Sequence, residues 1–394
     1  MTDKQTVKFG DICREVKLTT KDPIADGYER YIGLEHLDSG SLKIKRWGLI
    51  AEDKPSFTRV FKKGQILFGK RRPYLKKAAV AEFDGICSGD IIVMEPIRFS
   101  YDPSLIPYIV QSNIFWDAAI KSSSGSLSPR TKFKSLSNIE ITLHEKEFIH
   151  RKKSVLLMTE RASSHARDVC LAGEKLSFVL KKELLVGSWS NEKKKQANCG
   201  LIPESWEEER FDLIGKFLSG GTPKKSNESY WKGNFPWFSP KDMKTFNLEN
   251  SIDRVTKEGA LSGSKIIPEQ TILFVVRGMI LAHTFPVGIT NQESSFNQDM
   301  KAIQVNDEFD PLFILHWMIA NSSNFLSLVS TSTHGTKRLS SDAFSSLWVP
   351  KPPKEIQIRL VNSLENFRQL LEGISTREKD LNEIRQNLAN QLME

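Results

Sequence analysis

The chain of 394 residues carries one set of sequence features twice, in the same order. The matched positions, at offsets of 206 to 210, are Ile66 and Ile272, Asp90 and Asp299, Asp102 and Asp310, and Gly125 and Gly335. A single match is weak, but several in one order at a nearly constant offset indicate an internal duplication. Because solenoid repeats span only about 20–50 residues, this long period predicts two related globular units.

Each half has the pattern of short strands mixed with short helices. Apolar runs such as 272–276 have the length of a strand, and turns at 62–64 and 268–270 separate them. We therefore predict an α+β fold with two homologous domains, each built on an irregular, mostly antiparallel sheet.

A long helix-forming stretch follows each globular half. Residues 145–186 contain no proline and one glycine, and a second stretch runs from 352 to the C-terminus. Apolar or small residues recur at steps of three and four, which is the period of a coiled-coil seam. On the first helix this stripe is Val155, Met158, Ala162, His165, Val169, Ala172, Leu176 and Val179, and on the second it runs from Ile356 to Leu392 with Glu378 and Arg385 as polar interruptions.

We predict that these helices, each about 60 Å long at 1.5 Å per residue, pack together as an antiparallel coiled coil that separates the two domains. The alternative is that each helix packs on its own domain. The predicted segments are a first domain at 1–144, a central helix at 145–187, a polar linker at 188–200, a second domain at 201–351 and a C-terminal helix at 352–394.

Composition narrows the class of protein. The net charge is +8, and a basic balance favours a polyanionic partner. No apolar run approaches the ~20 residues of a membrane helix, and the first residues lack the apolar stretch of a signal peptide, so we expect a cytoplasmic protein that does not enter a membrane. The four cysteines are scattered and show no metal-ligand spacing, so we expect reduced packing residues and no metal site.

Basic residues gather in one segment of the first half. Between Phe61 and Ala78 there are seven basic residues and no acidic one, with Phe68 and Tyr74 interleaved. Such a cluster suits phosphate contacts, and an arginine in it can read guanine in the major groove. The alternative is a solvated basic hairpin. In the second half, lysines lie near Tyr230, Trp231 and Trp237, aromatic residues that we expect to pack in the core more often than to contact bases.

The second half also resembles a known family. Gly200-Leu-Ile-Pro-Glu-Ser-Trp206, Ser219-Gly-Gly-Thr-Pro223, Tyr230-Trp231 and Phe235-Pro-Trp-Phe-Ser-Pro-Lys-Asp242 follow one another. This ordered set resembles the opening of a target-recognition domain in the specificity subunits of type I restriction-modification enzymes. The first half carries a weaker version that lacks the Gly-Thr-Pro and Tyr-Trp elements, so the resemblance there depends on the duplication.

The resemblance implies a non-catalytic, sequence-specific DNA-binding subunit. Each domain would read one half of a bipartite target in double-stranded DNA, and the helices would set the spacing between the halves. The helices would also dock two methyltransferase subunits, which use S-adenosylmethionine, so no cofactor is expected on this chain. Motor-nuclease subunits would complete the restriction enzyme.

Candidate DNA-contacting residues come from the basic segment, the later loops and the equivalent loops of the second half. They are Lys62, Lys63, Lys70, Arg71, Arg72, Tyr74, Lys76, Lys77, Arg130, Lys132, Lys134, Thr222, Lys224, Lys225, Lys241, Arg277, His334, Lys337 and Arg338. The sequence contains no dinucleotide-binding, P-loop, amino-methyltransferase or zinc-protease motif, so we predict no catalytic residue. Two alternatives stay open: a stand-alone nuclease or modification enzyme with a duplicated DNA-binding region, and a coiled-coil assembly protein.

Overall fold

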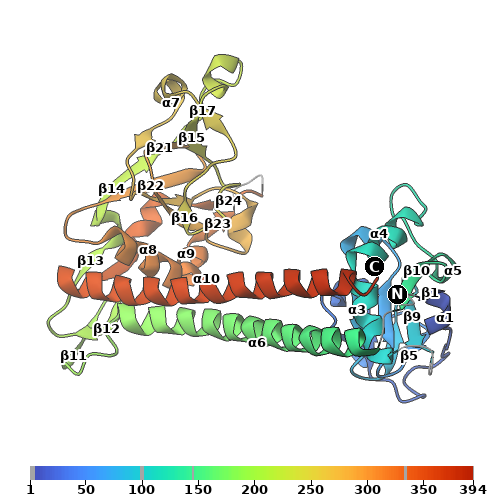
Figure 1. Cartoon of the computed structure of the whole chain (residues 1–394). Helices are drawn as coiled ribbons and strands as arrows, with labels where there is room; N and C mark the ends of the chain where they lie inside the picture. The colour runs from blue at the N-terminus through green and yellow to red at the C-terminus, as the bar shows by residue number, and fades with distance from the viewer. Residues whose placement is uncertain (1–4, 98–101, 144–145, 332–334, 394) are drawn as a thin grey trace. The chain divides into compact units, whose positions relative to one another are not determined.

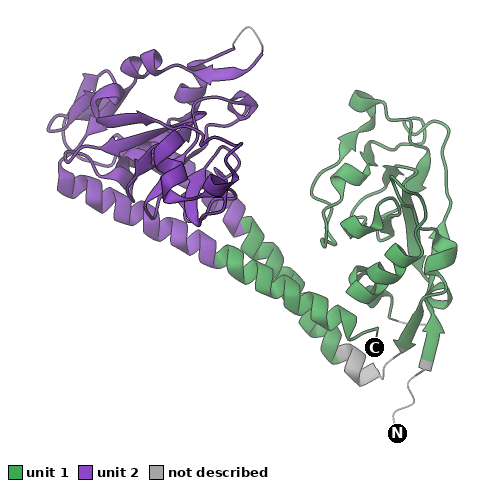
Figure 2. Cartoon of the chain, turned by 90° about the horizontal axis from the view of Figure 1, so that it is seen from above, with its two compact units in different colours: residues 1–168, 374–394 green, residues 169–373 purple. Residues whose placement is uncertain are grey.

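The computed structural model describes residues 5–97, 102–143, 146–331 and 335–393 (Figure 1). The chain divides into two compact units, residues 1–168 with 374–394 as unit 1 and residues 169–373 as unit 2 (Figure 2). Two long helices, α6 (Lys146–Leu185) and α10 (Lys354–Asn390), contribute residues to both units.

Unit 1 contains two four-stranded sheets. The first, entirely antiparallel, has the order β2 (Cys13–Val16), β9 (Ile91–Pro96), β6 (Ile66–Gly69) and β7 (Ala78–Val80). The second has the order β4 (Gly48–Leu49), β3 (Arg30–Ile32), β8 (Gly85–Cys87) and β5 (Arg59–Phe61), with β3 and β8 parallel. A separate pair joins β1 (Gln5–Lys8) to β10 (Glu140–Leu143). The short helices are α1 (Phe9–Ile12), α2 (Ile50–Asp53), α3 (Ile106–Gln111), α4 (Asn113–Lys121) and α5 (Phe133–Leu136).

The central strand β6 is buried on both faces because successive side chains of a strand point to opposite sides. Ile66 and Phe68 lie in one hydrophobic cluster, where the ring of Phe68 stacks on Trp116 with centroids 4.5 Å apart. Leu67 lies in the other cluster, together with Phe61 of the second sheet. The continuous apolar run of this strand therefore fits its position between two packed layers.

Unit 2 repeats this arrangement and adds strands. Its larger sheet has the order β14 (Gly215–Ser219), β22 (Met300–Val305), β19 (Ile272–Val275), β20 (Val287–Thr290) and β16 (Asn247–Leu248). Its second sheet has the order β17 (Arg254–Val255), β15 (Phe235–Phe238), β21 (Ser294–Phe296) and β18 (Ile266–Ile267). Strand pairs join β13 (Glu207–Arg210) to β25 (Trp348–Lys351) and β23 (Val329–Thr331) to β24 (Lys337–Leu339). The short helices are α7 (Lys257–Gly263), α8 (Pro311–Ala320) and α9 (Ser322–Ser327).

The two units share one topology. The order β2-β9-β6-β7 corresponds to β14-β22-β19-β20, and β4-β3-β8-β5 corresponds to β17-β15-β21-β18, with the middle pair of strands parallel in both second sheets. The repeated sequence features fall on equivalent elements, since Ile66 lies in β6 and Ile272 in β19. The predicted mixed α+β fold with mostly antiparallel sheets is confirmed.

The repeated Asp-Pro pair begins a helical segment in each unit. The carboxylate of Asp102 accepts a hydrogen bond from the amide of Ser104, and that of Asp310 accepts from Leu312 and Phe313. Aspartate is a favoured N-cap residue, and the proline that follows has a φ already suited to the first helical position. The duplicated dipeptide therefore marks the same structural boundary in both units.

The long helices run antiparallel within each unit. In unit 1, Ser163 Oγ donates to Asn382 Oδ1 at 2.9 Å and Arg167 Nε donates to Glu378 Oε1 at 2.7 Å. In unit 2, a Cβ added to Gly173 would come within 2.3 Å of the Leu371 side chain. The predicted stripe of α10 is the one that faces inward, because its members are buried or half-buried.

The predicted stripe of α6 is wrong. Its larger members are 43% to 68% exposed, and these are Val155, Met158, Val169, Leu176 and Val179. The buried face is displaced by about one residue and includes Leu156, Thr159, Ser163 and Gly173. Small and polar residues on this face allow the close contacts and hydrogen bonds to α10 described above. An exposed apolar stripe is therefore left along α6.

The segment 188–200, predicted as a polar linker, also differs from expectation. It includes β11 (Lys194–Ala197), which pairs with β12 (Gly200–Pro203) as an antiparallel hairpin. The carboxylate of Glu208 accepts hydrogen bonds from the amides of Asn198 and Cys199 at the turn. These contacts fix backbone groups that a freely moving linker would expose to water.

A buried histidine joins α8 to the helix pair in unit 2. His316 has no exposed surface, and its Nε2 lies 3.0 Å from Glu365 Oε1 on α10. Its Nδ1 is buried and has no hydrogen-bond partner among the described residues, so a charged imidazolium would bury an unpaired N–H donor. Burial lowers the pKa of His316, with the charges of Lys181 and Arg368 acting in the same direction and Glu365 in the opposite one. The hydrogen bond from His316 lowers the pKa of Glu365 to about 2, assisted by Arg368.

We predict that acid destabilises unit 2 through His316. Below pH ~6.5 the histidine is protonated in the unfolded state, whereas in the folded state its lowered pKa keeps it neutral. The free energy of unfolding therefore decreases as the pH falls below ~6.5. Each unit of lowered pKa is worth about 1.4 kcal/mol. Urea unfolding at pH 7.5 and 5.5 should show a drop in midpoint for the wild type and a smaller drop for His316→Gln. The exposed His283 is the control, because His283→Gln should keep the full drop. An equal drop in all three proteins would contradict the assignment.

Candidate nucleic-acid interface

The loop after β6 holds the strained residues of the basic segment. Arg72 and Lys76, on either side of the 3₁₀ turn Pro73–Leu75, have φ values of 53° and 49°. This left-handed region costs a non-glycine residue about 1–2 kcal/mol, and such residues cluster at functional sites. Gly278 stands at the equivalent place after β19, with a φ of 140°. The arginine is therefore not the residue that the backbone of this turn favours.

The seven basic residues of this segment do not form one surface. Lys62 and Lys63 precede β6, and the length of that strand places them about 13 Å from the loop that follows it. Lys62 Nζ lies 3.0 Å from Asp84, whose carboxylate also accepts from the amide of Lys63. The charge of Lys62 is thus partly neutralised at the far end of the strand.

Within the loop itself, some basic side chains bind the protein. Lys76 Nζ donates to Asn113 Oδ1 at 2.8 Å, and Lys77 Nζ donates to the carbonyl of Leu34 at 2.7 Å. Arg72 and Tyr74 are exposed, with Tyr74 51% exposed. The exposed part of the loop therefore consists of Arg72, Tyr74 and Leu75, with the neighbouring Arg71.

Arg71 meets Arg130 at one carboxylate. Arg130 Nε donates to Asp90 Oδ1 at 2.9 Å, and Arg71 Nη1 lies 3.5 Å from Asp90 Oδ2. Arg71 Nη2 also donates to Ser128 Oγ at 3.2 Å. The two arginine side chains are 40% and 47% exposed, whereas Asp90 is only 21% exposed. A shielded carboxylate thus holds two guanidinium groups that still reach solvent.

The electrostatics of Asp90 fit this arrangement. Partial burial alone would raise the pKa of Asp90, but the hydrogen bond from Arg130 and the charges of Arg130, Arg71 and Lys70 lower it below its usual value. The carboxylate is therefore ionised throughout the neutral range and stabilises the close approach of two like charges.

Unit 2 contains the same three residues at equivalent positions. Arg277 Nη1 lies 4.0 Å from Asp299 Oδ1, and an isolated β-bridge pairs Arg277 with Arg338 as another pairs Arg71 with Arg130. We call each set of two arginines and one aspartate a triad: Arg71, Asp90 and Arg130 in unit 1, and Arg277, Asp299 and Arg338 in unit 2. The aspartates are the repeated pair seen in the sequence, but sequence reasoning did not assign them to the site.

The other predicted residues of the late loops have separate positions. Lys132 and Lys134, at α5, are exposed. Lys337 Nζ donates to Thr331 Oγ1 at 2.8 Å within the pair β23–β24. His334 lies outside the described residues.

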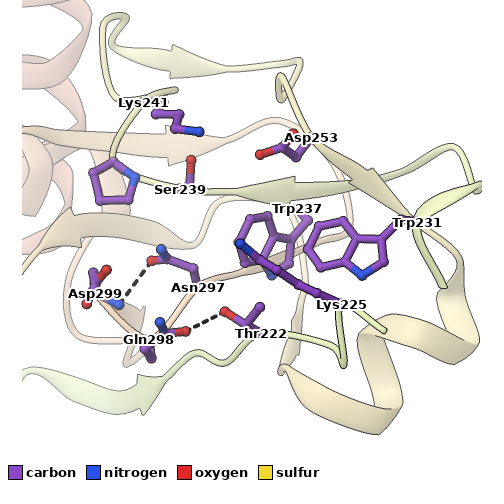
Figure 3. A pocket seen from close by; sticks show the side chains of 11 residues that line it. Thr222, Lys225, Trp231, Trp237, Ser239, Lys241, Asp253, Asn297, Gln298 and Asp299 are labelled. Carbon is purple, nitrogen blue, oxygen red and sulfur yellow. Dashed lines mark hydrogen bonds between the residues drawn. The ribbon is translucent and has the colours of Figure 1, made fainter. Parts of the chain in front are cut away.

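A cleft of about 820 Å³ opens in unit 2 beside the Gly-Gly-Thr-Pro turn (Figure 3). It brings together three of the predicted residues, Thr222, Lys225 and Lys241, whereas Lys224 is exposed outside the lining. The sequence analysis did not assign the remaining lining residues to the site; they are Trp231, Trp237, Ser239, Pro240, Asp253, Asn297, Gln298 and Asp299. Asp299 thus belongs both to this cleft and to the triad of unit 2.

Packing explains the Gly-Gly-Thr-Pro turn and the tryptophans. A Cβ at Gly220 or Gly221 would come within 2.3 Å of a backbone carbonyl oxygen, so only glycine fits at either position. Trp237 is 5% exposed, donates from Nε1 to the carbonyl of Gly221 at 3.0 Å, and packs edge-to-face with Trp231. As expected, Trp237 is mainly a packing residue, although part of its ring lines the cleft.

Among the residues that the structure describes, no group of three or more histidine, cysteine, aspartate or glutamate residues is placed to hold a metal ion. The four cysteines are free thiols. Burial raises the pKa of Cys13 and of Cys87 to about 12, so these two are protonated packing residues. No helix in the described part of the chain is long and apolar enough to cross a membrane.

Comparison with known proteins gives consistent matches. The chain is 33% identical over 164 residues to the Escherichia coli type I restriction enzyme EcoR124I/EcoR124II specificity subunit, covering 41% of each chain. It is 26% identical over 206 residues to the Methanocaldococcus jannaschii MjaIX specificity subunit, covering 50% of this chain and 45% of the relative. Each match thus spans less than half of the relative's own length.

Solved structures show the same fold at low sequence identity. A chain from a structure of a type I restriction-modification system superposes with a TM-score of 0.59 at 18% identity, covering 99% of this chain and 97% of that chain. The S subunit from M. genitalium gives a TM-score of 0.55 at 15% identity, covering 100% and 96%.

Residues 203–384 match the family model of the type I restriction modification DNA specificity domain. This range includes the sheets of unit 2, its triad and its cleft. The predicted resemblance to type I restriction-modification specificity subunits is therefore confirmed, and it is carried by residues 203–384, which match the DNA specificity domain of that family.

Proposed function

We propose that the chain is the DNA-recognition subunit of a type I restriction-modification enzyme, in which each globular domain reads one half of a split target in double-stranded DNA. The observation that carries this proposal is that the sheet order of the matched specificity domain recurs in unit 1, with the same triad of two arginines and one aspartate. A duplicated reading domain suits a target in two parts. The domains are residues 1–144 and 201–351.

The helices at 145–187 and 352–394 form the antiparallel coiled coil that sets the spacing between the half-sites. The exposed stripe of α6 supports a second role for this helix. Val169, Leu176 and Val179 are each at least half exposed, and exposed apolar surface of this kind commonly marks a protein interface. Two methyltransferase subunits dock on the helices, and motor-nuclease subunits join them in the cytoplasm.

The subunit itself is not an enzyme in this proposal. S-adenosylmethionine binds to the methyltransferase subunits, which methylate adenine. What this chain's residues supply is the choice of sequence: the triads and the loop of Arg72 and Tyr74 face the DNA.

The proposal is tested by mapping methylated adenines in cells that contain or lack this gene. We expect one split motif to be methylated only when the gene is present. Purified chain with S-adenosylmethionine and DNA should neither methylate nor cleave, whereas addition of the methyltransferase subunits should restore methylation of that motif. Methylation or cleavage by the chain alone would instead identify a stand-alone enzyme.

Arginines that read bases should differ from lysines that contact phosphates. We predict that Arg71→Ala or Arg72→Ala weakens binding to the mapped target about 10- to 100-fold, as expected for loss of a base contact. Lys225→Ala should weaken binding to all sequences by a smaller factor and shallow the salt dependence. Competition against scrambled DNA measures both effects. Equal losses on target and scrambled DNA for the arginine variants would remove their base-reading role.

Because the backbone at Arg72 is strained, a substitution there can distinguish the role of this residue in folding from its role in DNA binding. Because glycine adopts a φ of 53° without steric cost, Arg72→Gly should keep the stability of the wild type or raise it by up to about 1 kcal/mol. Its binding to the target should fall as far as that of Arg72→Ala. Thermal unfolding with DNA competition checks this, and a Gly variant that binds normally would show that the arginine is retained for another reason.

The exposed stripe of α6 makes a further prediction about the partner. The double change Leu176→Asp and Val179→Asp should weaken association with the methyltransferase subunits by at least tenfold, because charge would enter an apolar contact. DNA binding and the melting temperature should change little, since both side chains are already exposed. Leu171→Asp is the control, as Leu171 is equally exposed but points to another side of the helix. Loss of association with Leu171→Asp alone would move the interface to that side.

A further inference from the structure

We infer that each triad reads one G·C base pair, so that both halves of the target contain a G·C pair, and that Asp90 and Asp299 are positioning residues without which that reading fails. This inference rests on the proposed function and makes it more specific. It assigns to the two aspartates a role in recognition, which the basic character of the surface would not suggest.

The first argument compares the backbone hydrogen bonds that join the three chain segments of each triad. We call this set of bonds the backbone junction, and it is the same in both units although most of its side chains differ. In unit 1 the amide of Lys70 donates to the carbonyl of Asp90, and in unit 2 that of Val276 donates to the carbonyl of Asp299. The remaining equivalent hydrogen bonds run from Thr131 to Lys70, from Arg72 to Pro129, from Leu339 to Val276 and from Gly278 to Lys337.

Besides Asp90 and Asp299, the equivalent residues form six pairs. They are Lys70 and Val276, Arg72 and Gly278, Pro129 and Lys337, Thr131 and Leu339, Arg71 and Arg277, and Arg130 and Arg338. The first four pairs differ in charge, size or polarity, so the backbone geometry does not require particular side chains there. Only the two arginine pairs and the aspartate pair keep their identity. Their chemistry, rather than the fold of the junction, accounts for their presence in both units.

The second argument is the pattern of donors and acceptors that a triad presents. In the major groove a G·C pair offers the N7 and O6 acceptors of guanine and the N4 amino donor of cytosine. An arginine donates two hydrogen bonds to the guanine edge, and a carboxylate can accept from cytosine N4. Two arginines beside one aspartate therefore match this base pair, and the side chains of Arg71 and Arg130 are 40% and 47% exposed, so part of each guanidinium group is accessible to a base edge.

The third argument excludes a phosphate clamp as the main role. A site that only held phosphate would gain from two arginines and lose from an anion between them, because the carboxylate repels the phosphate. In unit 1 the carboxylate of Asp90 lies between the two arginines, 2.9 Å from Arg130 and 3.5 Å from Arg71, and in unit 2 Asp299 lies 4.0 Å from Arg277. The carboxylate lowers the positive potential of the site, but it holds the guanidinium groups in one orientation. A fixed orientation matters more for directed hydrogen bonds to a base than for attraction to a phosphate.

The test uses the complex as it exists in the cell. The gene is replaced by Asp90→Asn, Asp299→Asn or Asp38→Asn, and methylated adenines are mapped. Asp38 is the matched control, because it also holds two basic side chains, Lys45 at 3.3 Å and Arg46 at 2.7 Å, but lies outside the triads. Asparagine keeps the shape and removes the charge. Melting temperatures of the purified variants monitor folding, and Asp299→Asn, with the weaker ion pair at 4.0 Å, serves if Asp90→Asn does not fold.

We expect Asp90→Asn to relax the preference at one G·C pair in one half of the motif, and Asp299→Asn at one G·C pair in the other half. Binding to the target should fall about 10- to 100-fold, while binding to scrambled DNA stays equal or rises. Asp38→Asn should change neither half. A half-site without a G·C pair, relaxation at no position, or a parallel rise in binding to target and scrambled DNA would each overturn the inference. Absence of any split motif in the wild type would overturn the proposed function itself, which is a distinct result.

A second measurement separates reading from a purely structural effect. In a duplex of the mapped target, 7-deazaguanine at the identified guanine removes the N7 acceptor. Wild-type binding should fall about tenfold, and the Asp variant of that half should show a smaller further loss, because its arginine no longer reaches N7. If wild type and variant lose the same factor, the aspartate does not act through that guanine.

Discussion

The end of β6 is tied to two other segments by backbone hydrogen bonds, from Lys70 to Asp90 and from Thr131 to Lys70, and β19 ends in the same way. Backbone amides and carbonyls near a core must be paired, and this pairing fixes three chain segments at one point of each unit. The side chains of Arg71, Asp90 and Arg130 project from those segments. Their mutual distances therefore follow from the sheet, whose central strand is buried on both faces, and do not depend on loop packing alone.

The stripes of the two long helices show what periodicity can and cannot predict. Helix existence followed from the absence of proline and the steps of three and four, and the stripe of α10 faces inward as predicted. On α6 the same rule selected the exposed face, because the buried face uses Thr159, Ser163 and Gly173, which carry little hydrophobic signal. Small residues let two helices approach closely, so the interhelical face is defined by size and hydrogen bonding. The large apolar residues on the outer face are the ones that the proposed function assigns to a partner subunit.

The candidate site was predictable in parts for equally physical reasons. The duplication located Asp90 and Asp299, and charge located Arg71 and Arg277, but linear sequence could not join them, since Asp90 and Arg130 are 40 residues apart. The count of basic residues along the sequence also placed Lys62 and Lys63 in one cluster with Arg72, although strand β6 lies between these two lysines and the loop of Arg72. The cleft of unit 2 was missed because Trp231 ends a 3₁₀ turn, whereas Asn297 and Gln298 lie in the turn after β21, and only the folded sheet brings these segments together.

A duplicated chain supplies an internal comparison that separates scaffold from recognition. The two units differ at positions that take part in equivalent backbone hydrogen bonds, such as Lys70 and Val276 or Thr131 and Leu339. Arg72 and Gly278 occupy equivalent turns with positive φ. Glycine is the residue that this conformation favours, so the arginine of unit 1 is maintained against a steric cost. The two halves thus share the triad and differ in what surrounds it. Under the proposed function, such a division would let one fold present a common reading element to two half-sites, while the neighbouring side chains would make the half-sites distinct.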